Sequence, residues 1–171
     1  MKTFGKILGG LVIAVVACVI VGLVILSVTG LDPKDRRPGL WLTGTVATAP
    51  ASDWSFTDKI PVIELQTHTP YGLPHSVNIW CVTYNGQLYL HAGMPAGAPF
   101  PGNKAWAADV IRDPRVRLKI DGQLYDGVAM QVTEQSEIAA LNQATSKKYP
   151  PLAGTAYYFH IVPTASGRTA A

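Results

Sequence analysis

The sequence is poor in cysteine, and this excludes two kinds of structural cross-link. Only two cysteines, Cys18 and Cys81, occur among 171 residues. Cys18 lies in a long apolar segment and Cys81 in a predicted strand, so we do not expect them to pair. No Cys/His cluster has the spacing of a zinc site, and the four histidines are scattered. We therefore predict neither a disulfide framework nor a metal site.

The sequence also lacks an excess of charge of either sign beyond its first 30 residues. From Leu31 onward it carries twelve Lys and Arg against eleven Asp and Glu, because Lys2 and Lys6 account for the other two of its 14 cations. A nearly neutral domain without a basic stripe argues against nucleic acid as its main partner. A catalytic triad is not evident either, since the neighbours His75 and Ser76 point to opposite faces of a strand.

The longest stretch without any charge is Ile7 to Val28, which contains 22 residues rich in Val, Ile and Leu. A bilayer core of roughly 30 Å needs about 20 apolar helical residues, so this segment is long enough to span it. A cleaved signal peptide has a shorter apolar core of roughly 7–15 residues and a small-x-small cleavage site. We therefore predict an uncleaved single-pass anchor within residues 1–30, with residues 7–28 in the membrane.

The side of the membrane depends on the flanking cations, and these are nearly balanced. Lys2 and Lys6 precede the apolar segment, and Lys34, Arg36 and Arg37 follow it. A short basic N-terminus ahead of a long apolar run resembles a signal-anchor. This pattern favours an extracytoplasmic, periplasmic location for the domain that follows.

The rest of the chain indicates one mainly β domain of the α+β class. We predict a linker at 31–38, a domain at 39–163 and a tail at 164–171. Within 115–120, alternation places three cations on a solvent-facing side. About six antiparallel strands with two helices favour a small barrel. The predicted strands are 39–47, 59–68, 74–84, 87–91, 115–120, 123–132 and 156–162, and the predicted helices are 103–112 and 134–149.

The stretch from Pro74 to His91 is the centre of this domain. Two β-rich runs are separated by Asn85-Gly86, which is the strongest short-range signal for a hairpin. Polar residues begin both faces of the first strand, and apolar residues follow. The strand therefore runs either from a ligand-facing mouth into a core, or from an exposed end into a half-buried sheet.

A loop and a helix start follow the hairpin. Residues 93–102 contain three Gly and three Pro, which exclude regular structure. The helix after this loop begins near Lys104, with Asn103 as the predicted N-cap and with Trp106, Val110 and Ile111 facing inward. Helix N-termini attract anions, and a lysine there adds a positive charge. A phosphate group fits such a position.

The order of these motifs resembles a known family. Pro-His-Ser-Val-Asn-Ile-Trp-Cys-Val, Asn-Gly-Gln-Leu-Tyr-Leu, Asn-Lys-Ala-Trp and Arg-Asp-Pro-Arg-Val-Arg-Leu are similar to the FMN-binding split β-barrel family of pyridoxamine 5′-phosphate oxidase-like proteins. The resemblance covers roughly residues 39–162. It implies an oxidoreductase in which FMN does the chemistry, usually a homodimer with flavin at the subunit interface. The implied cofactor-binding residues are His75, Ser76, Val77, Asn78, Trp80, His91, Asn103 and Lys104.

The sequence departs from this family at three points. His75 stands where many members have Arg, Asn103 replaces the cationic or hydroxyl partner of Lys104, and the 93–102 loop is longer than usual. The Pro-x-x-Val-x-x-Trp strand is also similar to the deazaflavin-dependent nitroreductase branch, which implies a deazaflavin coenzyme instead of FMN.

A hypothesis of another class is a non-catalytic cofactor-binding or partner-binding module tethered to the membrane. It is motivated by the missing cationic partner of Lys104 and by a stripe of small residues every fourth position from Gly10 to Gly22.

Overall fold

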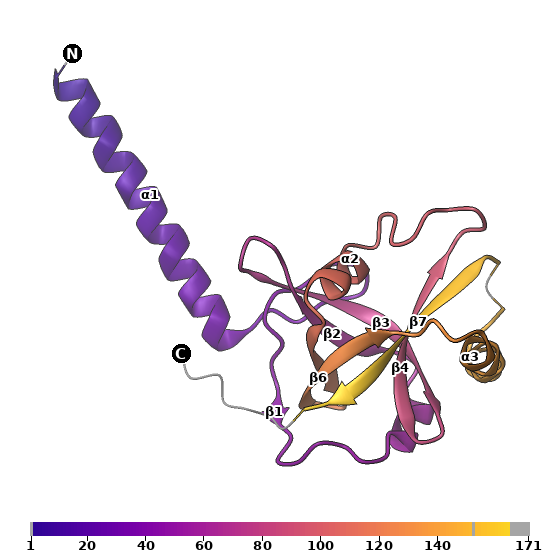
Figure 1. Cartoon of the computed structure of the whole chain (residues 1–171). Coiled ribbons are helices and arrows are strands. Elements are labelled where there is room, and N and C mark those ends of the chain that lie inside the picture. The colour runs from indigo at the N-terminus through magenta and orange to yellow at the C-terminus, as the bar shows by residue number, and fades with distance from the viewer. Residues whose placement is uncertain (1, 152, 165–171) are drawn as a thin grey trace.

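The structure, a computed structural model, describes residues 2–151 and 153–164. An isolated N-terminal helix leads into a β-barrel with two short helices at its surface (Figure 1). Most of the predicted 164–171 tail lies outside the described residues.

Six antiparallel strands close into the barrel, in the order β6-β5-β2-β3-β4-β7 with a further pairing of β6 with β7. This confirms the predicted split barrel with two helices and a preceding apolar helix. The helices are α1 (Lys2–Thr29), α2 (Ala105–Arg112) and α3 (Gln135–Lys148), with a 3-10 turn η1 (Ser55–Lys59). The strands are β1 (Thr45–Val46), β2 (Ile63–His68), β3 (Pro74–Tyr84), β4 (Gln87–Met94), β5 (Arg115–Ile120), β6 (Gln123–Gln131) and β7 (Thr155–Pro163).

Two tight turns set the register of the barrel. Asn85 and Gly86 join β3 to β4 with φ angles of 51° and 74°, and Asp121 and Gly122 join β5 to β6 with 51° and 77°. Asn, Asp and Gly tolerate these left-handed angles, and two such residues give a turn whose twist matches the strands. The Asn-Gly hairpin predicted from sequence is confirmed.

Alternation along the strands divides inside from outside. Leu88 and Leu90 of β4 point into the barrel and are fully buried there, together with inward residues of the other strands. His91 lies on the outer face of the same strand. Trp106 of α2 packs edge-on against Phe159, with ring centroids 5.6 Å apart, and so joins this helix to the barrel core.

The predicted strand at 39–47 is wrong for most of its length. Only Thr45–Val46 is a strand, and it pairs in parallel with the start of β6. The backbone before it bonds to separate partners instead of one neighbouring strand. Gly39 exchanges hydrogen bonds with Ser76, and the Leu42 N–H donates to the Gln66 side chain over 2.8 Å. A continuous ladder therefore cannot form there.

Two details of the predicted 103–112 helix are also wrong. The helix begins at Ala105, so Lys104 is the N-cap residue, and no side-chain hydrogen bond caps this end. Ile111 is exposed, whereas Trp106 and Val110 are buried. Residues 106, 107 and 110 share one face of a 3.6-residue period, and position 111 is turned about 100° away from 110.

Helix α1 contains the one segment, among the residues that the structure describes, that is long and apolar enough to cross a membrane. Its span Gly9–Thr29 has a mean hydropathy of 3.3, and none of it is buried against the barrel. Gly30 ends the helix with φ 74°, and its N–H bonds to the Leu26 carbonyl over 2.8 Å.

The predicted linker packs on the barrel from its first residue. The Leu31 N–H bonds to the Trp41 carbonyl over 2.8 Å, and the Leu40 N–H returns to the Leu31 carbonyl over the same distance. Gly39 then pairs with Ser76 of β3. Gly30 alone therefore separates the end of α1 from the first hydrogen bond of the barrel domain.

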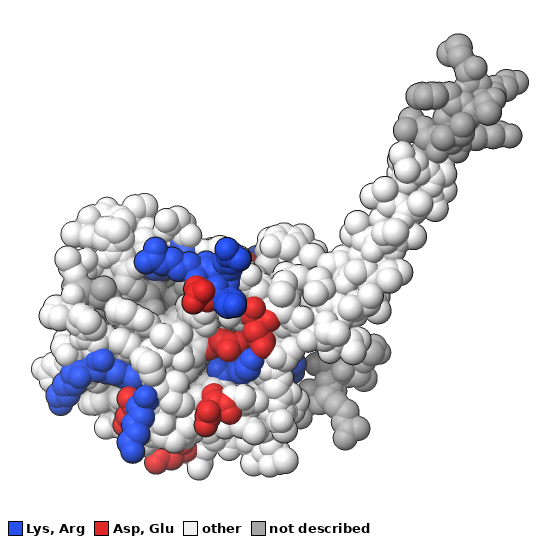
Figure 2. Space-filling model, turned by 180° about the vertical axis from the view of Figure 1, so that it is seen from behind, with Lys and Arg blue, Asp and Glu red and all other residues white. Residues whose placement is uncertain are grey.

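Asp32 fixes this segment to the barrel. Its carboxylate accepts the Thr43 N–H over 2.8 Å and lies 2.5 Å from the Lys119 ammonium. Burial opposes the charge of Asp32, but Lys119 and Thr43 outweigh it and lower the pKa of this carboxyl below its usual value. Lys119, expected on a solvent-facing side, is instead largely buried between Asp32 and Glu64. Figure 2 shows acidic side chains lying directly beside basic ones on the face seen there.

We expect Gly39→Ala to detach this segment and destabilise the domain. A Cβ at position 39 would lie against the backbone carbonyl of Leu31, 2.7 Å from the backbone carbonyl carbon of Asp32 and 2.6 Å from the Ser76 side-chain Oγ. Overpacking of this kind costs about 1–3 kcal/mol. Urea unfolding of the full chain in detergent, followed by tryptophan fluorescence, measures the loss. Gly10→Ala, where a Cβ meets nothing within 4 Å, is the control. Equal stability of the two variants would contradict the packing described.

Candidate functional site

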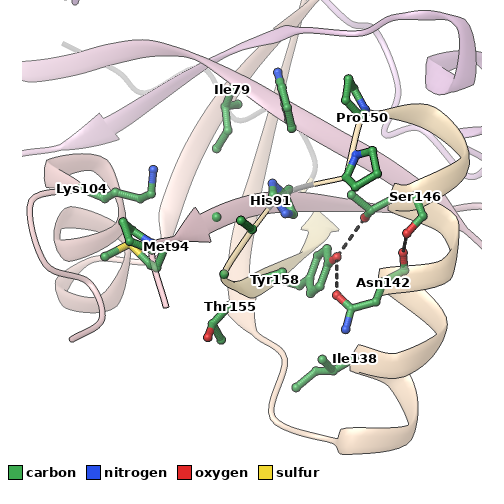
Figure 3. Close-up of a pocket in the computed structure, with 18 of the residues that line it drawn as sticks. Ile79, His91, Met94, Lys104, Ile138, Asn142, Ser146, Pro150, Thr155 and Tyr158 are labelled. Carbon is green, nitrogen blue, oxygen red and sulfur yellow. Dashed lines mark hydrogen bonds between the residues drawn. The ribbon is translucent and has the colours of Figure 1, made fainter. Parts of the chain in front are cut away.

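A cavity of about 860 Å³ opens on the outer side of the barrel, between strands β3, β4 and β7, the start of α2, and α3 (Figure 3). The loop from α3 to β7 forms its remaining wall. Of the described residues that line it, none is Asp or Glu, and Lys104 is the one with a permanent positive charge. The cavity therefore favours anionic or neutral ligands over cations.

The Lys104 end of the cavity is suited to an anion. Lys104 is half-buried and forms no ion pair with any residue that the structure describes. As the N-cap, it precedes the N–H groups of Ala105 and Trp106, which have no partner within the helix. Two backbone donors and one ammonium group thus meet at the start of α2. Such an arrangement binds phosphate or carboxylate groups.

His91 forms the floor of the cavity. It is buried between Trp80, with ring centroids 5.8 Å apart, and Tyr158, which meets it edge-on at 5.4 Å. Burial, together with the positive charge of Lys104, lowers the pKa of His91 from 6.5 to about 4. The imidazole is therefore neutral near pH 7, with one nitrogen as donor and the other as acceptor.

Trp80 is an aromatic wall that other residues hold in place. Its ring stacks on Tyr149 with centroids 4.4 Å apart and planes 4° from parallel. The Tyr149 hydroxyl lies 2.7 Å from the carbonyl oxygens of both Pro61 and Cys81. Burial, with Cys81 adding to it, raises the pKa of Tyr149, so the hydroxyl keeps its proton. One face of Trp80 is therefore covered, and its position is fixed.

The α3 side of the cavity is polar. The Tyr158 hydroxyl donates to the Asn142 Oδ1 over 3.0 Å and lies 2.9 Å from the Thr145 Oγ1. The Ser146 hydroxyl donates to the Asn142 backbone carbonyl over 2.7 Å. Figure 3 shows Asn142 reaching from α3 toward Tyr158 of β7. None of these polar side chains was among the residues expected from sequence, although positions 142, 145 and 146 share one helix face.

The structure brings four of the eight predicted residues to the cavity. These are Asn78, Trp80, His91 and Lys104, from three different elements. Asn78 lies at the rim, where its amide donates to the Asp35 carbonyl over 3.1 Å.

The other four predicted residues do not line the cavity. The His75 ring lies 3.6 Å from the Asp109 carboxylate, and Val77 packs against the barrel core. Both are on the face of β3 opposite to Trp80. Ser76 shares the Trp80 face, but Gly39 covers it, and it is fully buried. Asn103 is exposed.

Comparison with known proteins identifies solved structures with a similar fold, at low sequence identity. No known family model matches the sequence, and no curated protein is significantly similar to it. Among solved structures, a conserved hypothetical protein from Mycobacterium tuberculosis is similar, with a TM-score of 0.51 and 21% identity over 71% of this chain and 86% of that one.

Two more distant structures carry functional names. A candidate pyridoxamine 5′-phosphate oxidase from Listeria innocua has a TM-score of 0.46 and 17% identity over 64% of this chain and 88% of that one. An F420-H2-dependent reductase has a TM-score of 0.43 and 17% identity over 60% of this chain and 95% of that one.

The closed barrel of six antiparallel strands agrees with the split-barrel fold that the sequence motifs suggested. At these identities the likeness concerns the fold alone.

Proposed function

We propose that this protein is a membrane-anchored flavin-type oxidoreductase that acts on a small molecule. The observation that carries the proposal is the cavity itself. It joins an anion-binding end at Lys104 to a fixed aromatic wall at Trp80, and no carboxylate occurs among the described residues that line it. A cofactor with a phosphate at one end and a planar ring at the other would match these two parts of the cavity.

The described residues fit FMN in outline. Lys104 and the first N–H groups of α2 would hold the phosphate, and Trp80 and neutral His91 would lie along the ring. A bound flavin supplies hydride or electron transfer, so the protein needs to supply position, electrostatics and exclusion of water. Asn78 at the rim is placed to contact the same ligand. No direct contact with the cofactor is proposed for the four predicted residues that do not line the cavity, which are His75, Ser76, Val77 and Asn103.

A deazaflavin coenzyme is the alternative within the same class. It too carries a planar ring and a phosphate, so the Lys104 end serves either cofactor. The absence of a second cation at position 103 weakens the case for FMN, because Asn103 is exposed and offers no charge.

The absorption spectrum of the full chain purified in detergent tests the proposal. We expect visible absorption as isolated, or a change in absorption or fluorescence on adding FMN. A colourless protein that does not respond to FMN but binds the deazaflavin coenzyme would favour the alternative. A protein that binds neither would contradict the proposed function.

A second candidate function is a non-catalytic cofactor-binding or partner-binding module. It is favoured by the lack of any acidic side chain among the described cavity residues, so that no carboxylate there could move a proton. Turnover of reduced cofactor with an artificial electron acceptor distinguishes the two functions. Robust turnover that depends on bound cofactor would exclude the inert module.

We further propose that α1 anchors the protein in a membrane with the barrel on the extracytoplasmic side, and that the protein is a homodimer. The apolar span supports the anchor, and the basic N-terminus supports the orientation. A reporter fused after Ala171 tests the orientation, and a cytoplasmic signal would overturn it. The mass of the detergent-solubilised protein, measured by light scattering, tests the dimer.

A further inference from the structure

We propose that Asn142 is a specificity-determining residue of the cavity, and that its amide nitrogen donates a hydrogen bond to an acceptor on the ring edge of the bound cofactor. Tyr158 and Thr145 are the positioning residues that present this donor. The inference rests on the proposed function, and it assigns the end of the cavity opposite to Lys104.

The direction of the hydrogen bonds follows from the atom of Asn142 that faces Tyr158, which is Oδ1. The Tyr158 hydroxyl has one hydrogen and donates it to the Asn142 Oδ1 over 3.0 Å. The Thr145 Oγ1 lies 2.9 Å from the Tyr158 hydroxyl oxygen, and because the Tyr158 hydrogen is already donated, Thr145 is the donor in this contact. These bonds hold the Asn142 side chain against Tyr158, with its oxygen toward the Tyr158 hydroxyl. Its nitrogen has no partner among the described residues and remains available to a ligand.

Other groups on this wall cannot replace that donor. The Ser146 hydroxyl already donates to the Asn142 backbone carbonyl over 2.7 Å, so it can only accept. Tyr158 is nearly fully buried, and burial raises its pKa, which keeps its proton in place at neutral pH. Asn142 itself is exposed toward the open cavity. The α3 wall therefore offers one free donor, in a fixed direction.

The two ends of the cavity then recognise different chemistry. Lys104 and the N-terminus of α2 bind negative charge, whereas Asn142 donates a hydrogen bond to the ring. A donor at this position selects a ring with a carbonyl oxygen or an unprotonated nitrogen at its edge. A hydrogen bond to such an atom also changes the electronic absorption of the ring, and a contact with the phosphate does not.

The test uses the full chain in detergent and FMN as the probe, with the deazaflavin coenzyme in a parallel titration. We expect Asn142→Ala to weaken binding of the cofactor that the protein takes by roughly three- to tenfold, as expected for one neutral hydrogen bond. Asn142→Asp should weaken it by more than about tenfold, because an acceptor then faces an acceptor. Gln143→Asp makes the same change of charge one residue along α3, outside the cavity, and should leave binding nearly unchanged.

The absorption spectrum of the bound cofactor separates ring recognition from a general loss of structure. Asn142→Ala and Tyr158→Phe should shift its bands, whereas Lys104→Ala should weaken binding and leave the bands in place. Binding that persists unchanged in Asn142→Asp would mean that the amide presents its oxygen, and it would overturn the inference while the proposed function stands. A protein that binds neither cofactor overturns both.

Discussion

Replacing Lys104 by Ala is expected to weaken cofactor binding by about tenfold to a hundredfold. A charge-assisted hydrogen bond to a phosphate is worth roughly 1.5–3 kcal/mol, which converts to this range. Lys104 makes no ion pair with the described residues and lies at the N-cap of α2, where it lines the open cavity and is not part of the barrel core. The loss should therefore appear in the dissociation constant for FMN or the deazaflavin coenzyme and hardly in the stability of the fold.

The control for this experiment must be a lysine outside the cavity and outside any ion pair. Lys119 does not qualify, because it is bound to Asp32 and Glu64, and its loss would loosen the segment after α1. Lys59 at the end of η1 is exposed and does not line the cavity, so Lys59→Ala should bind as the parent does. If Lys104→Ala also binds as tightly as the parent, the anion-binding role of this end is wrong.

The stability of the domain is expected to fall as the pH drops from 6.5 to 4, largely because of His91. In the folded state its pKa is about 4, below its ordinary value of 6.5, so between these values the unfolded chain binds a proton that the folded chain does not. The contribution of neutral His91 is fully present above 6.5 and is lost as the pH approaches 4. It amounts to at most about 3 kcal/mol.

Urea unfolding between pH 4 and 7.5, followed by tryptophan fluorescence, measures this dependence. The variant His91→Gln cannot titrate and should show a flatter profile in that window. His160→Gln is the matched control, because burial also lowers the pKa of His160 but Glu137 opposes it, and only a small part of the slope should disappear. A slope in His91→Gln as steep as in the parent would show that other groups carry the pH dependence.

The same environment predicts how a bound anion acts on His91. The positive charge of Lys104 helps to lower the pKa of this imidazole. A phosphate group at Lys104 neutralises part of that charge and should raise the pKa again. The cofactor-loaded protein should therefore lose less stability through His91 between pH 6.5 and 4 than the ligand-free protein does.

Sequence patterns predicted the parts of this fold that depend on neighbouring residues. Asn85-Gly86 and Asp121-Gly122 set two hairpins because their backbone angles are local properties. The Gly- and Pro-rich segment at 93–102 correctly indicated a loop, after which a helix begins near Lys104. The backbone conformation of residues 39–47 was not predictable in this way, because Gly39 pairs with Ser76, which lies 37 positions further along the chain.

The candidate site was half predictable for the same reason. Trp80 and His91 were expected from one hairpin, and both lie on its outer face. Asn142 and Thr145 were missed because polar residues on one face of a helix usually face solvent. They form a wall of the cavity only because α3 packs beside β7 and brings them to Tyr158. The contact of α3 with Tyr158 depends on how the distant strands of the barrel come together, and the local sequence pattern does not encode that arrangement.

The short connection after α1 determines what the cavity can reach. A flexible linker of eight residues would let the barrel sample a volume tens of ångströms wide, but here one glycine, spanning about 3.5 Å, is the whole free length. If α1 spans a bilayer, the mouth of the cavity stays at a nearly constant height above it. Encounters with other membrane proteins then become a search in two dimensions, in which only partners with an exposed group at that same height can exchange electrons or ligands with the bound cofactor.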